Sequence, residues 1–122
     1  MISKNKTALI TGATGGLGLS IAEEFYEKKY NLILTGTNDS KLESLESKFT
    51  NNIKVIKCNL AKQEDILKMF DIIPSEFDGV DILINNAGIT KDNLFLRMKE
   101  DDWDKVLNIN LKANYSLCKM VI

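Results

Sequence analysis

Short runs of apolar residues alternate along the chain with longer segments in which apolar residues recur at helical spacing. The short runs have the length of β-strands and occupy residues 8–11, 32–36, 53–58 and 80–85. Repeated alternation of strand and helix is typical of α/β proteins, in which right-handed crossovers place helices on both faces of a parallel sheet. The pattern therefore predicts an α/β fold built on a parallel sheet.

The helical segments lie between these runs and after the last one. Residues 17–29 carry an apolar face formed by Leu17, Ile21, Ala22 and Phe25. A cap at Asn38 or Asp39 is expected to open the second helix. Residues 63–73 are expected to form the third, which Pro74 ends.

Composition narrows the range of functions. The 122 residues are enough for one domain and too few for two. Lysine and arginine number 16, aspartate and glutamate 17, and no block of like charge occurs. Because binding to nucleic acid or to an anionic membrane requires clustered positive charge, we expect no nucleic-acid and no membrane partner.

The cysteines and the N-terminus exclude further classes. Cys58, Cys118 and the absence of histidine leave no usual zinc site and no Cys-His nucleophile pair, so no metal is predicted. We interpret Cys58 as a small buried apolar side chain. The apolar run after Lys6 is interrupted at Thr11, too early for a signal peptide, and no run approaches the roughly 20 residues of a membrane span. We therefore expect a cytoplasmic protein.

Four glycines, Gly12, Gly15, Gly16 and Gly18, lie between the first strand and the first helix. The first N–H groups of a helix lack partners and carry the positive end of its dipole, and a loop without Cβ atoms lets a diphosphate approach them. A flexible turn is the alternative. A P-loop is excluded, because residues 7–27 contain no lysine.

Residues 11–18 read TGATGGLG, which resembles the TGxxxGxG cofactor loop of the short-chain dehydrogenase/reductase family. Members of that family bind NAD or NADP on a Rossmann fold. The resemblance implies a doubly wound sheet with strand order 3-2-1-4. It also implies cofactor contacts from Gly12, Thr14, Gly15, Gly16, Leu17 and Gly18.

A second motif lies at the end of the fourth strand, where residues 81–88 read DILINNAG. In a doubly wound sheet the first and fourth strands flank the ligand crevice, so this end and the glycine loop should face one cleft. Alone, the segment could be a turn. Beside the glycine loop it resembles the family's NNAG signature, which implies cofactor contacts from Asn86, Ala87, Gly88 and the following Ile89.

The end of the second strand bears on the choice of cofactor. Residues 35–38 read TGTN, without the acid that holds the ribose 2′-hydroxyl of NAD, and we interpret Asp39 as a helix cap. We therefore favour NADPH over NADH, with Thr37 at the 2′-phosphate. Many NADP-preferring relatives have an arginine in the glycine loop or after this strand, and this chain has neither. The resemblance also implies that Asn59 and Leu60 lie against the adenine.

From about residue 102 onward the pattern predicts one more helix. Its apolar seam comprises Trp103, Leu107, Asn110, Asn114, Leu117 and Val121. Asn110 is thus expected to be buried, where an unpaired amide would cost roughly 1 to 3 kcal/mol. It is either a structural amide or, by resemblance, the family's catalytic asparagine, whose carbonyl helps to hold a proton-relaying water. Asn114 stands where relatives usually have an apolar residue.

Residues 85–103 resemble the β-ketoacyl-acyl-carrier-protein reductases within the family, which continue from NNAG into Ile-Thr, a basic residue, Asp-Asn-Leu and Arg-Met. This implies NADPH-dependent reduction of 3-oxoacyl thioesters of acyl carrier protein to 3-hydroxyacyl thioesters in fatty acid biosynthesis. It also implies a homotetramer that uses the last helix. A reductase of another carbonyl, a dinucleotide-binding module without catalysis and a methyltransferase remain alternatives.

The family's catalytic serine, tyrosine and lysine are expected beyond these residues. Tyr115 and Lys119 read Y-x-x-x-K, but they share the helix of Asn110 and no strand with a serine precedes them. We interpret them as a solvated or interface face. Since members of the family are about twice as long, residues 1–122 are interpreted as a single Rossmann dinucleotide-binding domain, truncated before the catalytic segment. Lys29 departs from the glycine that often ends the first helix of relatives.

Overall fold

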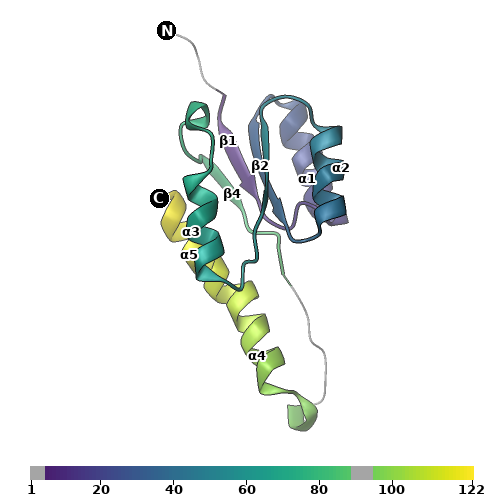
Figure 1. The fold of residues 1–122 in the computed structure, drawn as a ribbon, viewed down its shortest axis with the longest axis vertical. Coiled ribbons are helices and arrows are strands. Elements are labelled where there is room, and N and C mark those ends of the chain that lie inside the picture. The colour runs from purple at the N-terminus through teal and green to yellow at the C-terminus, as the bar shows by residue number, and fades with distance from the viewer. Residues whose placement is uncertain (1–4, 89–94) are drawn as a thin grey trace.

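A four-stranded parallel sheet with helices on both faces organises the computed structural model, which describes residues 5–88 and 95–122 (Figure 1). The sheet order is β3-β2-β1-β4, so the predicted α/β fold and the order 3-2-1-4 are confirmed. The strands are β1 (Thr7–Ile10), β2 (Asn31–Gly36), β3 (Ile53–Lys57) and β4 (Ile82–Ile84). β4 is shorter than predicted, because only its three residues pair with β1.

The helices form two layers around the sheet (Figure 1). One layer consists of α1 (Gly16–Glu27) and α2 (Asp39–Lys48), and the other of α3 (Gln63–Asp71) and α5 (Ala113–Val121). The helix α4 (Glu100–Leu107) extends beyond the sheet and continues into α5 through a π-helical turn, η3 (Asn108–Lys112). Two short 3-10 turns complete the described elements, η1 (Ser75–Phe77) and η2 (Phe95–Arg97).

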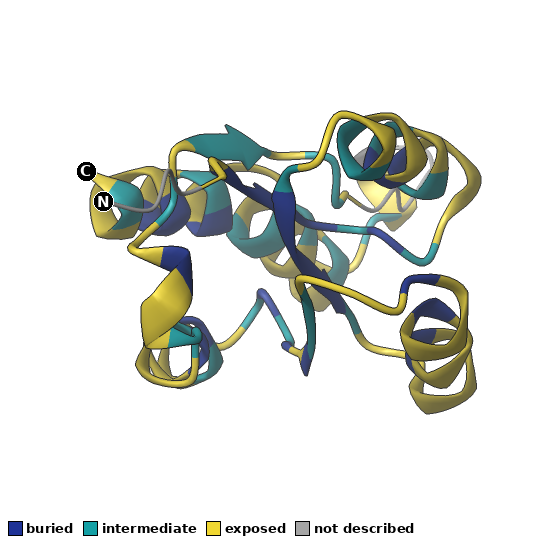
Figure 2. Ribbon diagram, turned by 90° about the horizontal axis from the view of Figure 1, so that it is seen from above, coloured by how far each residue is buried: buried dark blue, intermediate teal, exposed yellow. Residues whose placement is uncertain are grey.

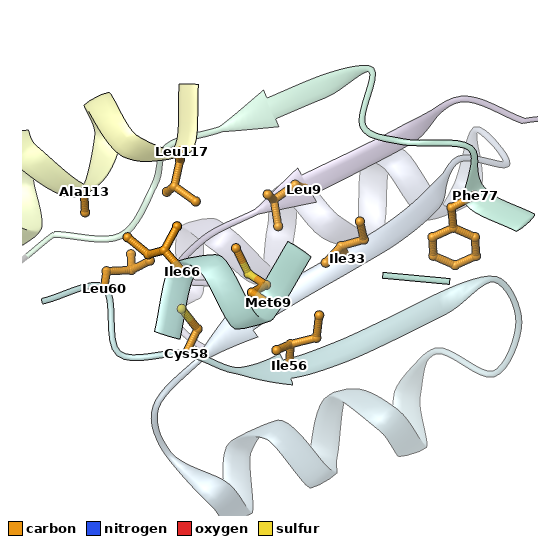
Figure 3. Packing of buried hydrophobic residues seen from close by; sticks show 10 residues of the cluster. All are labelled: Leu9, Ile33, Ile56, Cys58, Leu60, Ile66, Met69, Phe77, Ala113 and Leu117. Atoms are coloured by element: carbon orange, nitrogen blue, oxygen red, sulfur yellow. The ribbon is translucent and has the colours of Figure 1, made fainter. Parts of the chain in front are cut away.

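Each face of the sheet has its own hydrophobic core. Successive side chains of a strand point to opposite faces, and helices cover both, so β1 and all of β2 except Gly36 are buried. The helices are exposed on their outer sides (Figure 2). On the α3 and α5 side the core contains Leu9, Ile33, Ile56, Ile66, Met69 and Leu117 (Figure 3). On the α1 and α2 side it contains Ala8, Ile10, Leu32, Leu34, Ala22, Leu42 and Leu45. Burying one such Leu or Ile is worth about 1.5–3 kcal/mol.

The end of α1 is closed without glycine. Lys29, which stands where relatives often have a glycine, has a φ of +66°, in the left-handed region. The N–H of Lys29 donates to the carbonyl of Tyr26 and that of Tyr30 to the carbonyl of Phe25, the two bonds of a Schellman motif. The helix therefore ends where a relative with glycine would end it, at a cost of about 1 kcal/mol for the Cβ of lysine.

Two predictions about helix starts are wrong. Asn38 is the cap of α2, because its side chain accepts from the N–H of Lys41, so Asp39 is the first helical residue and not a cap. Leu17 is 68% exposed rather than on the apolar face of α1. It lies in the first turn of that helix, and the buried face begins with Gly18 and Ala22.

Candidate functional site

The ends of β1 and β4 are joined by one buried hydroxyl. Thr11 follows β1, and its N–H donates to the carbonyl of Ile84 at 3.1 Å. Its Oγ1 accepts from the N–H groups of Asn86 and Ala87, at 3.1 and 3.0 Å. Two backbone donors of the NNAG segment are thus held by one side chain. Sequence reasoning gave Thr11 no role, although its place just before Gly12 was the available signal.

Two of the loop glycines are needed for packing. The side-chain amide of Asn86 donates to the carbonyl of Gly12 at 3.1 Å. A Cβ on Gly12, whose φ is +63°, would lie 2.9 Å from the Cα of Ala87. A Cβ on Gly18 would collide with the carbonyl of Gly12 and lie 2.8 Å from the Nδ2 of Asn86. Gly12 and Gly18 therefore let the glycine loop, α1 and the NNAG segment come together.

The other two glycines leave open space at the start of α1. The nearest neighbour of a Cβ on Gly15 would be the carbonyl oxygen of Gly12, at 3.7 Å, and a Cβ on Gly16 would meet nothing within 4 Å. Gly15 is the N-cap, with no side-chain cap hydrogen bond and no acidic residue in the first turn. The positive end of α1 is thus accessible, as binding of an anion requires.

One cleft of about 320 Å³ collects most of the predicted cofactor residues. Those that line it are Gly12, Thr14, Gly15, Thr37, Asn59, Leu60, Asn86, Ala87 and Gly88. They are joined by Thr35, Gly36, Cys58 and Ile109, and none of these lining residues is charged. Gly16 and Leu17 are exposed at the start of α1 outside the lining, and Gly18 is buried. Ile89 lies outside the described residues.

The part of the cleft that follows β3, residues 58–60, has no reactive side chain at neutral pH. Burial, together with the nearby Asp65 carboxylate, raises the pKa of Cys58 to about 11, so the thiol stays protonated at neutral pH. Asn59 holds the following turn, because its N–H donates to Asp65 and its Oδ1 accepts from Ala61. Leu60 is only 8% exposed and belongs to the core. This part of the cleft offers shape rather than reactive groups.

The expectation that Asn110 is buried is wrong, because the residue is exposed. It lies in the π-helical turn η3, where the N–H of Ala113 donates to the carbonyl of Asn108, five residues back. The wider turn shifts the residues after it away from the 3.6-residue period that was assumed. The buried positions of α5 are Ala113, Ser116 and Leu117.

Asn110 nevertheless lies beside the cleft. A Cβ on Gly88 would lie 3.2 Å from the Oδ1 of Asn110, so that side chain faces the NNAG segment. The carbonyl of Asn110 accepts from the Nδ2 of Asn114 at 3.0 Å. Among the described residues the buried Oδ1 of Asn114 finds no hydrogen-bond partner. The sequence signal for this contact was the i, i+4 spacing of the two asparagines.

Tyr115 and Lys119, the Y-x-x-x-K pair of the sequence, lie outside the cleft. Tyr115 is 66% exposed. Residues 5–88 and 95–122 contain no group of three or more His, Cys, Asp or Glu that could hold a metal ion. Within the same ranges, no helix has the length and apolar character needed to traverse a lipid bilayer.

Comparison with known proteins places the chain among dehydrogenases. The family model described as short chain dehydrogenase matches residues 6–122. The 3-oxoacyl-[acyl-carrier-protein] reductase FabG of Rickettsia felis is 44% identical over 117 residues, which are 96% of this chain and 47% of that relative. The chain therefore spans about half the length of the relative that it matches.

Two solved structures superpose on nearly all of the chain. A short-chain dehydrogenase/reductase from Brucella melitensis, described as a glucose/ribitol dehydrogenase, has a TM-score of 0.89 and 32% identity, covering 97% of this chain and 51% of that one. A closed serine dehydrogenase complexed with NADP+ has a TM-score of 0.88 and 26% identity, covering 95% of this chain and 47% of that one.

The two kinds of glycine can be separated by substitution. We expect Gly18→Ala to lower the free energy of unfolding by about 3 kcal/mol or more, because its Cβ meets backbone that cannot move aside. The matched variant Gly16→Ala, with open space around its Cβ, should change it by less than about 1 kcal/mol. Urea denaturation measures both, and equal midpoints for the two variants would contradict the packing role of Gly18.

Proposed function

Since the chain belongs to the short-chain dehydrogenase family, we propose that it is the cofactor-binding half of an NADPH-dependent reductase. One observation carries this proposal: the uncapped start of α1 and the NNAG segment face one cleft without charged lining residues. A dinucleotide has a dianionic diphosphate at its centre and two uncharged rings, the adenine and the dihydronicotinamide, at its ends. The dipole of α1 and the N–H groups at its start suit the diphosphate, and the uncharged walls of the cleft suit the two rings.

Each part of the cleft receives a role in this proposal. The diphosphate lies over Gly15 and Gly16, in the region that Gly12, Thr14, Leu17 and Gly18 shape. The adenine lies against Asn59 and Leu60, beyond the β2 and β3 ends. The nicotinamide lies along Asn86, Ala87 and Gly88, with Ile89 following. In this arrangement backbone N–H groups bind the diphosphate, because the glycine loop contains no arginine.

The preference for NADPH rests on what surrounds the adenosine end. Thr37 follows β2 and lines the cleft, and no acidic side chain does so. A 2′-phosphate therefore meets a hydroxyl rather than the carboxylate that selects NAD. The similar serine dehydrogenase structure is itself a complex with NADP+. NADH is the less favoured cofactor.

We propose a 3-oxoacyl thioester of acyl carrier protein as substrate, in fatty acid biosynthesis in the cytoplasm. The supporting observation is 44% identity with a 3-oxoacyl-[acyl-carrier-protein] reductase. When bound, NADPH supplies the hydride that reduces the C3 carbonyl. Asn110 is the proposed catalytic residue of these 122 residues. Its backbone carbonyl, which accepts from the Nδ2 of Asn114, is the group to which we assign the water that relays protons.

The C-terminal helix supports a homotetramer. Its outer side carries an apolar stripe at i, i+4 spacing, formed by Trp103, Leu107, Leu111 and Tyr115, which are 52, 39, 66 and 66% exposed. Contiguous exposed apolar side chains of this size mark association surfaces. A two-fold axis across the stripe would bury it against the same stripe of another copy.

The dinucleotide site is tested by two substitutions of Gly15 that differ only in a carboxylate against an amide. Gly15→Asp should stabilise α1 by about 0.5 kcal/mol, because a carboxylate caps the helix, yet weaken NADPH binding about tenfold by repelling the diphosphate. The matched variant Gly15→Asn adds a neutral cap and should retain more of the affinity. Isothermal titration measures binding, and equal affinities of the two variants would contradict an anion site at Gly15.

Turnover separates the catalytic from the binding-only function. The full-length protein should oxidise NADPH with acetoacetyl-acyl carrier protein, as followed at 340 nm. Asn110→Ala keeps the backbone carbonyl but removes the side chain that faces Gly88 and so holds this turn in place, and it should therefore lower kcat. The Kd of NADPH should change little, because Asn110 lies outside the lining of the cleft. NADPH binding without turnover would favour a non-catalytic module. Binding of S-adenosylmethionine in place of NADPH would overturn the proposed function.

The role of the apolar stripe in the proposed tetramer is tested by introducing one charged side chain into it. Leu111→Lys should reduce the molar mass of the full-length protein in light scattering from that of a tetramer, because a lysine would be desolvated in the interface. Leu67→Lys is the control, since Leu67 is 45% exposed on α3 and outside the stripe. A tetramer that survives Leu111→Lys would show that this stripe is not the interface.

A further inference from the structure

A second groove, of about 700 Å³, adjoins the neutral cleft at its adenosine end. The two share Thr37 and Asn59, and only the second is lined by charged side chains. Its cations are Lys57, Lys62 and Lys68, and its acids are Asp65 and Asp71. Asp65 is already engaged by the N–H of Asn59, at 3.0 Å. The groove is therefore where an additional negative charge on the cofactor would meet lysines.

Among these lysines, Lys57 is fixed against the end of β2. It is the last residue of β3 and pairs in register with Gly36, the residue before Thr37. The N–H of Cys58, the residue that follows β3, donates to the carbonyl of Gly36 at 3.0 Å. Lys57 thus stands across the strand pair from the position at which dinucleotide-binding folds read the ribose.

The Lys57 side chain is held by the acid that follows the β2 end. Its Nζ lies 3.1 Å from Oδ1 and 3.3 Å from Oδ2 of Asp39. Both side chains remain largely exposed, so the pair is available to a ligand. Without Lys57, the Asp39 carboxylate would stand uncompensated two residues after Thr37. Such a charge would favour a ribose hydroxyl over a phosphate.

We propose that Lys57 selects NADPH over NADH, by neutralising Asp39 and donating to the 2′-phosphate beside Thr37. The proposal rests on the proposed function, since it requires a dinucleotide in the adjoining cleft. In many NADP-preferring relatives an arginine in the glycine loop or after the second strand would bind the 2′-phosphate. In this chain a lysine at the end of β3 takes that role. The glycine loop, residues 12–18, and the β2 end, residues 35–38, contain no cation that could take this task.

The experiment compares two cofactors that differ only at the 2′ position. Dissociation constants of NADPH and NADH are measured by titration calorimetry on the full-length protein and on four variants, Lys57→Gln, Asp39→Asn, Lys48→Gln and Lys62→Gln. Lys57→Gln should weaken NADPH about fivefold, the size expected of a partly exposed charged contact, and leave NADH within about twofold. Asp39→Asn should tighten NADPH, because it frees Lys57 and removes a repelling charge. The loss in Lys57→Gln should shrink as salt is raised.

Lys48→Gln is the matched control. Lys48 is also exposed and ion-paired, with Glu23 at 3.9 Å, but it lies at the other end of α2. Its removal changes the net charge equally and should alter neither constant. The NADH constant also reports whether each variant is folded.

Three results would overturn the assignment to Lys57: equal weakening of both cofactors by Lys57→Gln, no weakening of NADPH, or an equal effect of Lys48→Gln or Lys62→Gln. A wild-type protein that binds NADH and not NADPH would overturn the proposed NADPH preference itself. A wild-type protein that binds neither would overturn the proposed dinucleotide site. Binding of 2′,5′-ADP more tightly than AMP, lost in Lys57→Gln, would support the 2′-phosphate as the group recognised.

Discussion

The candidate site depends on the close approach of the ends of β1 and β4. Thr11 satisfies two backbone N–H groups of the NNAG segment, and the Asn86 amide binds the Gly12 carbonyl. These donors are partly buried, and a fully buried donor left unpaired costs about 1–3 kcal/mol, so the contact resists opening. Gly12 and Gly18 are required because any Cβ there would hold the segments apart. The start of α1 is thereby fixed at the cleft.

This packing puts the positive end of the α1 dipole at the cleft without any charged side chain in the cleft lining. The cleft lining contains no ionisable side chain apart from the protonated thiol of Cys58, and the proposed anion site relies on the backbone N–H groups at the start of α1. A dipole built into the fold needs no counterion and no side-chain ordering when a ligand arrives. The ion pair of Asp39 and Lys57 lies at the end of the cleft that we propose for the adenosine. In this proposal, different groups bind the diphosphate and select the ribose.

The C-terminal helix links the cleft to the outer surface. Its π-helical turn brings the Asn110 side chain beside Gly88, while α5 packs Leu117 into the core. π turns are often found at functional sites, because they add one residue to a helix and redirect the side chains around it. The same helix leaves the stripe from Trp103 to Tyr115 exposed on its outer side. One element therefore connects a proposed catalytic position with a proposed interface.

The sequence by itself determined the α/β fold, from its local periods, and the meeting of the glycine loop with the NNAG segment, because parallel strands end at one edge of a sheet. The strand order was predicted from the resemblance to the short-chain dehydrogenase family, and the left-handed conformation of Lys29 is a finding of the structure. The tertiary structure decided which glycines pack and which stay open, since that depends on backbone from another strand end. It also decided the exposure of Asn110 and the pairing of Asp39 with Lys57. A π turn breaks the helical period, and an ion pair between a helix and a strand leaves no periodic trace in the sequence.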